Sequence, residues 1–154
     1  CIYYGDENAA WGYADPFNRA PFDWDKINKE IFEHTKSLAH LRRENDCLSV
    51  GDYTMLYYSG GAICYMRSIT GGKDTFGKRA NNGSMLVFLN PSGEYVQIPL
   101  ELGRFNVKRV IDTLDNRIIA EGCTFIMDIP PYSSGVYALE RNEASCTKIK
   151  PLQK

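Results

Sequence analysis

The hydrophobic period of this chain changes once, near residue 47, and this change limits the possible folds more than any other feature. Between residues 26 and 44 apolar side chains recur with the spacing of one helix face. They are Ile27, Ile31, Leu38 and Leu41. Beyond residue 47 apolar and polar residues alternate in short segments rich in Val, Ile, Tyr, Phe and Met. The predicted strands are 53–58, 62–69, 84–90, 95–100, 107–114, 117–121, 123–129 and 135–141.

Turns rich in Gly, Pro, Asn and Ser separate these segments. Strands this short and this regularly spaced are typical of an antiparallel β-sandwich of the Greek-key type. We therefore predict a mainly β fold, with a helix-containing part over 1–46 and a β-sandwich domain over 47–154. Residues 70–83, which are rich in Gly, Asn and basic side chains, are predicted to form a mobile hairpin loop.

Charge and hydropathy exclude two classes of partner. The 154 residues carry 18 Lys and Arg against 19 Asp and Glu, a net charge of −1. Such a chain has no general basic field, so we expect neither nucleic acid nor an anionic membrane as a partner. Its longest apolar runs are far too short to span a bilayer. The 10 Tyr suit either a β-rich core or a carbohydrate-contacting surface, and composition does not choose between them.

The five cysteines and two histidines do not form a metal-binding pattern. No cysteine pair is spaced Cys-x-x-Cys, and His34 and His40 share one helical stretch without cysteine neighbours. We therefore predict no metal and no cofactor. Cys64 and Cys123 fall inside predicted strands and are expected to be buried. The odd cysteine count favours a reducing compartment, such as the bacterial cytoplasm.

The first 24 residues read as a strand followed by a long aromatic loop. Cys1–Tyr4 is apolar and β-prone, and Gly5 interrupts it. Asp6 and Glu7 form a tempting carboxylate pair, but neighbours in an extended chain point to opposite sides. A turn in which both carboxylates accept hydrogen bonds is the better interpretation. Because the chain opens on a strand pattern without Met, we expect it to be a fragment of a longer protein.

The loop between residues 8 and 24 carries the candidate binding residues. Asp15 and Arg19 stand four positions apart on a proline-stiffened stretch, with Trp11 and Tyr13 close by in sequence. Carboxylate and guanidinium groups give directional hydrogen bonds to hydroxyls, and aromatic faces can stack on the apolar faces of sugars. The same two residues could instead pair with each other and stiffen the loop. The pattern does not decide between these interpretations.

Several stretches resemble one known family. Residues 1–7, 15–19 and 21–24 resemble the last barrel strand and following loop of α-amylase-type glycoside hydrolases (family 13), in the neopullulanase, cyclomaltodextrinase and α-glycosidase branch. Residues 38–42 resemble the end of the last barrel helix of that family. Residues 51–53, 86–90 and 129–133 fit its C-terminal β-domain.

The resemblance implies a fold and an activity. It implies that residues 1–46 are the last βα unit of a truncated (β/α)₈ barrel and that residues 47–154 are the C-terminal β-sandwich. Active sites of such barrels lie on the βα loops, so the loop over 5–24 would face the sugar and Asp15, Arg19, Trp11 and Tyr13 would be substrate-binding residues. The parent would hydrolyse α-glucans such as starch, maltodextrin or pullulan with retention.

The resemblance also limits what this chain can do by itself. The catalytic carboxylates of the family lie on earlier barrel strands, so this chain is expected to contain no catalytic residue and to be inactive alone. It would stabilise the barrel and supply one substrate-facing loop. A non-catalytic carbohydrate-binding sandwich and a purely structural domain remain alternatives. Apolar surface left without its barrel partners could also cause self-association.

Overall fold

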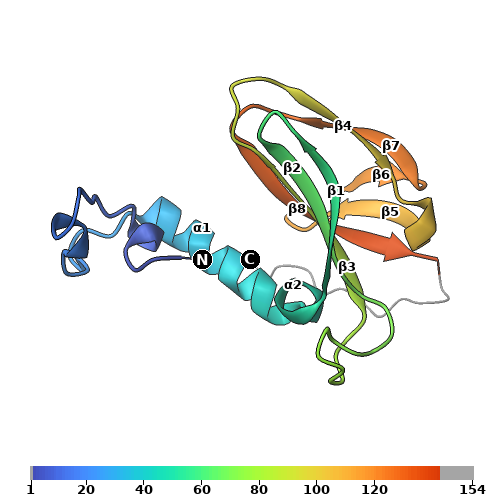
Figure 1. Ribbon diagram of the computed structural model, residues 1–154, viewed down its shortest axis with the longest axis horizontal. Coiled ribbons are helices and arrows are strands. Elements are labelled where there is room, and N and C mark those ends of the chain that lie inside the picture. The colour runs from blue at the N-terminus through green and yellow to red at the C-terminus, as the bar shows by residue number, and fades with distance from the viewer. Residues whose placement is uncertain (1, 143–154) are drawn as a thin grey trace. The chain divides into compact units, whose positions relative to one another are not determined.

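The computed structural model describes residues 2–142, and the chain divides into two compact units, Cys1–Leu41 and Arg42–Lys154. The first unit contains most of one long helix, α1 (Lys29–Glu44), after an irregular stretch with short 3₁₀ turns at Asp6–Asn8 and Phe17–Arg19 (Figure 1). Among the described residues, no helix is long and apolar enough to cross a membrane.

The strand predicted for Cys1–Tyr4 does not form over the described residues 2–4. The backbone turns there instead: the amide of Tyr3 donates to the Asp6 carboxylate at 2.9 Å, and the amide of Asp6 donates to the carbonyl of Tyr3 at 3.1 Å. An extended segment needs a neighbouring strand for its backbone groups, and none of the described strands pairs with it. The turn satisfies these groups locally.

Helix α1 begins three residues later than the hydrophobic period predicts. Asn28 caps it, because its side-chain oxygen accepts the amide of Ile31 at 3.3 Å. The preceding acidic residue Asp23 does not cap the helix, since its carboxylate accepts the amide of Asp25 at 3.2 Å in the turn before it.

The second unit is a two-sheet β structure that follows a short helix, α2 (Asp46–Val50). Eight strands follow within the described part of this unit, and each corresponds to a segment predicted from alternation, so the mainly β antiparallel fold is confirmed. The strands are β1 (Asp52–Ser59), β2 (Ala62–Ile69), β3 (Gly83–Asn90), β4 (Val96–Glu101), β5 (Val107–Asp112), β6 (Ile118–Glu121), β7 (Thr124–Ile129) and β8 (Ser133–Arg141).

Six strands form one antiparallel sheet in the order β1-β2-β3-β8-β5-β6, and β4 pairs with β7 in a second sheet (Figure 1). The chain leaves the large sheet after β3 and returns to it at β5. The core combines inward side chains from both sheets, so their burial stabilises the sandwich as one body. They include Cys64, Met66, Leu86, Phe88, Ile98, Leu100, Met127, Ile129 and Leu139.

The loop between β2 and β3 is anchored by side chains rather than free. The Asp46 carboxylate on α2 accepts the backbone and side-chain amides of Asn81, both at 2.8 Å. The hydroxyl of Thr75 donates to the carbonyl of Val50 at 2.6 Å. The sequence predicts a mobile hairpin here because residues 70–83 are rich in Gly, Asn and basic side chains. Such a composition does not reveal these long-range hydrogen bonds. The loop presents Phe76 to solvent.

Two cysteine expectations have opposite outcomes. Cys64 is completely buried in the core, as predicted. Cys123 is exposed, because β7 begins only at Thr124 and Cys123 belongs to the turn before it. Its carbonyl, rather than its thiol, has the structural role: it accepts the amide of Leu102 at 2.6 Å.

Burial of thiols makes the stability of the fold sensitive to alkaline pH. Desolvation raises the pKa of Cys64 from 9.0 to about 12 and that of Cys47 from 9.0 to about 11. An unfolded chain releases these protons from pH 9 upward, whereas the folded chain retains them to about pH 11 or 12. The thiols therefore leave the free energy of unfolding unchanged below pH 9. Above pH 9 they lower it, by up to about 1.4 kcal/mol per pH unit for each thiol.

Urea unfolding at pH 8.0, 9.5 and 10.5 checks this expectation. Cys64→Ala should lower stability at every pH because it leaves a cavity, but its loss between pH 9.5 and 10.5 should be smaller than that of the wild type. An unchanged pH slope in Cys64→Ala would show that other groups cause the alkaline loss.

Candidate functional site

The turn after Tyr4 shapes the candidate site. Gly5 has a φ of +94°, and a Cβ on this residue would lie 2.8 Å from Cβ of Ala10, so glycine is required there. The amide of Ala10 donates to the carbonyl of Gly5 at 2.9 Å and closes the turn. The Asp6 and Glu7 carboxylates accept the backbone amides of Tyr3 and Gly5 at 2.9 and 2.8 Å. The prediction that this acidic pair stabilises a turn is confirmed.

Asn8 connects this turn to the start of α1. Its side-chain oxygen accepts the amide of Asn28 at 2.5 Å, and its amide group donates to the carbonyls of Asp23 and Lys26 at 3.4 Å each. Asn8 is buried, although it lies on a largely exposed stretch. Sequence reasoning missed it, since its partners lie 15 to 20 residues away. The loop over 9–24 is therefore held at both of its ends.

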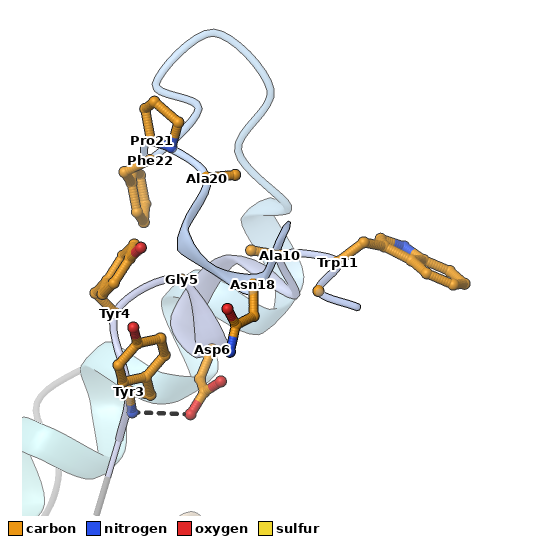
Figure 2. A pocket seen from close by; sticks show the side chains of 11 residues that line it. Tyr3, Tyr4, Gly5, Asp6, Ala10, Trp11, Asn18, Ala20, Pro21 and Phe22 are labelled. Atoms are coloured by element: carbon orange, nitrogen blue, oxygen red, sulfur yellow. Dashed lines mark hydrogen bonds between the residues drawn. The ribbon is translucent and has the colours of Figure 1, made fainter. Parts of the chain in front are cut away.

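A hollow of about 240 Å³ opens between the turn and the returning loop. Figure 2 shows the rings of Tyr3, Tyr4 and Phe22 along one side, with the amide of Asn18 close to the Asp6 carboxylate opposite them. The rings of Tyr3 and Tyr4 lie 4.6 Å apart. Desolvation, with the neighbouring Tyr3 phenol as a second cause, raises the pKa of the Tyr4 phenol above its ordinary value.

The four residues predicted to bind substrate do not all lie at this hollow. Trp11 lines the hollow, but its indole points away from the tyrosines and is 86% exposed (Figure 2). Tyr13 is exposed and lies outside the lining. Asp15 and Arg19 form an ion pair, with 2.6 Å between Oδ1 and Nε, and both side chains are mostly exposed. A pair so open to solvent adds little stability, so both groups are accessible to a ligand at small cost.

The groups that line this hollow are suited to binding a ligand. They offer aromatic faces, a side-chain amide and phenol hydroxyls, which together match a ligand with hydroxyls and apolar faces. Asp15 and Arg19 lie outside this lining. The Asp6 carboxylate already accepts a backbone hydrogen bond. Across residues 2–142, no group of three His, Cys, Asp or Glu side chains could hold a metal ion.

Comparison with known proteins gives relatives along most of the chain. A cyclomaltodextrinase from Geobacillus thermopakistaniensis is 32% identical over 142 residues, which is 91% of this chain and 23% of that protein. An amylopullulanase from Thermoanaerobacter thermohydrosulfuricus is 36% identical over 104 residues, which is 68% of this chain and 7% of that protein. This chain thus spans less than a quarter of the length of these relatives. No family model matches it.

Solved structures give the same fold. An α-amylase from Anoxybacillus superposes with a TM-score of 0.73 at 20% identity, over 92% of this chain and 29% of that one. An α-amylase from Geobacillus thermoleovorans, complexed with acarbose, gives a TM-score of 0.72 at 23% identity, over 90% and 29% of the two chains. Sequence and fold together show that this chain belongs to the α-amylase family of glycoside hydrolases.

Proposed function

We propose that this chain serves as the C-terminal part of an enzyme that hydrolyses α-glucans, where it stabilises the barrel and supplies one substrate-facing loop without taking part in catalysis. In this proposal residues 1–46 are the last βα unit of the barrel and residues 47–154 are the accessory sandwich. The enzyme as a whole would act on starch, maltodextrin or pullulan.

One observation carries the proposal: the loop over 9–24 exposes an unusual concentration of large aromatic side chains. Trp11, Tyr13, Phe17 and Trp24 are all more than two thirds exposed within this single stretch. Exposed aromatic side chains at this density are typical of a ligand-binding or protein-binding surface. The Asp15–Arg19 pair adds hydrogen-bonding groups to the same loop. Complexes of neighbouring structures with acarbose and with maltose support an oligosaccharide as the ligand.

A non-catalytic carbohydrate-binding module is the second candidate. It is favoured by exposed tyrosines on the sandwich, among them Tyr53, Tyr95 and Tyr132. The two candidates differ in where the sugar binds, since the first places it on the loop over 9–24 and the second on the sandwich.

Calorimetric titration with maltoheptaose, paired with a reducing-sugar assay, tests the first candidate. We expect weak binding and no release of reducing sugar above the blank. Trp11→Ala should weaken binding about three- to tenfold, because it removes one stacking face. Phe76→Ala is the matched control: it removes an aromatic ring of similar exposure from the β2–β3 loop and should leave binding unchanged.

Two results would contradict the proposal. Turnover of maltoheptaose by the purified chain would show that catalytic groups are present in it. Equal affinities of Trp11→Ala, Phe76→Ala and the wild type would place the sugar outside the loop over 9–24.

A further inference from the structure

Tyr132 combines an exposed ring with an uncommon backbone conformation. It lies between β7 and β8, has a φ of +50° and is 79% exposed. Bulky residues rarely adopt positive φ, and they persist there only where the surrounding structure enforces it. The ring of Tyr132 is not part of the core cluster, so core packing does not explain the conformation.

The surrounding structure that holds Tyr132 is a pair of joined loops. The amide of Tyr132 donates to the carbonyl of Ser92 at 3.0 Å. Asn90, buried beneath both loops, donates from its side-chain amide to the carbonyls of Glu94 and Pro130 at 2.8 Å each. The side-chain oxygen of Asn90 accepts the hydroxyl and the amide of Ser92 at 2.7 and 3.1 Å. The β3–β4 and β7–β8 turns are thus one rigid body at one end of the sandwich (Figure 1).

The ring of Tyr132 lies on the backbone of Gly93. A Cβ at Gly93 would be 3.1 Å from the hydroxyl oxygen of Tyr132 and 3.6 and 3.8 Å from two of its ring carbons. Glycine therefore leaves room for the ring to rest against the turn, while the high exposure leaves the rest of the ring to solvent. This arrangement presents an aromatic surface that is supported from behind.

Further polar and aromatic residues lie on the turns near this ring. The side chains of Glu94 and Tyr95 are exposed on the same turn as Gly93. Tyr58 is exposed next to the β1–β2 turn, whose Gly61 lies beside Pro91. We call the set of Ser92, Gly93, Glu94, Tyr95 and Tyr132 the tyrosine platform.

We propose that the tyrosine platform binds a neutral oligosaccharide, at a site separate from the loop over 9–24. A sugar ring has one apolar C–H face, which can stack on Tyr132, and hydroxyls at its edge, which can donate to the Glu94 carboxylate. A protein partner would favour a continuous apolar patch, whereas here single rings alternate with polar groups. That the oligosaccharide is an α-glucan rests on the function proposed above.

NMR titration of the 17.5 kDa chain with maltoheptaose tests the proposal residue by residue. Backbone amide shifts over 92–95 and at 132 report the platform, and shifts over 5–20 report the loop. We expect saturable shifts at the platform. Tyr132→Gly should weaken the affinity read there about tenfold or more and spare the fold, because glycine accepts positive φ. Tyr132→Phe keeps the ring and should retain most of the affinity. Phe76→Ala should change nothing.

The possible outcomes separate the two proposals. Shifts over 5–20 with none at the platform would overturn the platform and leave the proposed function standing. Shifts at the platform with none over 5–20 would support the platform and count against the loop. Platform shifts that persist in Tyr132→Gly would overturn the role of the ring. Platform shifts that depend on protein concentration without sugar would identify a protein contact and also overturn the proposal.

Discussion

Replacing Asn90 with alanine is expected to lower the free energy of unfolding by about 3 kcal/mol. The side chain of Asn90 is 1% exposed and connects the β3–β4 turn to the end of β7. Its removal takes one hydrogen bond each from the carbonyls of Glu94 and Pro130 and from the amide of Ser92, and leaves a cavity in the buried end of the sandwich. Urea unfolding followed by circular dichroism measures the loss.

Two further variants test whether the lost stability comes from this buried hydrogen-bond network or from removing any side-chain amide. Gln97→Ala removes an exposed side-chain bond to Asp128, at 2.9 Å, and should change stability by less than about 0.5 kcal/mol. Asn90→Asp keeps the shape but replaces the donating amide nitrogen with an oxygen that faces carbonyl oxygens, so it should destabilise at least as much as alanine does. Wild-type stability in Asn90→Asp would mean that the donor bonds contribute little.

Alternation predicted the strands well because each one has a core face. β2, for example, has its predicted bounds of 62–69, and its inward residues Cys64 and Met66 are fully buried. Alternation does not identify a strand's partner. The pairing of β4 with β7 in a separate sheet could not be predicted, since both strands show the same period as those of the large sheet.

The candidate site was less accessible to sequence reasoning than the strands were. Opposite orientation of neighbouring residues correctly predicted that Asp6 and Glu7 would serve a turn. For Asp15 and Arg19 the sequence left an ion pair and a ligand contact open, and the structure shows the ion pair while ligand contact stays a proposal. Asn8 escaped notice because its role depends on tertiary contacts.

The two binding surfaces proposed here differ in how their geometry is enforced. On the loop over 9–24 the aromatic side chains project from irregular backbone that Asn8 secures at its ends. At the tyrosine platform the buried Asn90 holds two turns together beneath the exposed ring. Asn90→Ala should therefore weaken any sugar binding at the platform while leaving binding at the loop unchanged.

The second large effect is expected at Gly51, the residue between α2 and β1. Its φ of −80° and ψ of 168° suit any residue, so conformational strain is not the reason for glycine. A Cβ there would lie 2.5 Å from the carbonyl oxygen of Cys47 and 2.9 Å from that of Ser68. Both atoms belong to backbone, in α2 and β2, and neither can move without displacing its element. Gly51→Ala should therefore cost about 3 kcal/mol or more.

Gly71→Ala is the control that isolates this steric cause. Gly71 lies in the β2–β3 loop, its φ is not positive, and nothing lies within 4 Å of an added Cβ. Alanine there restricts the unfolded chain without a clash and should be neutral or stabilising by up to about 1 kcal/mol. Opposite signs for the two substitutions in urea unfolding are the expected result. Equal effects would show that α2 can shift away from β2, and that the start of the sandwich is less tightly packed than these distances imply.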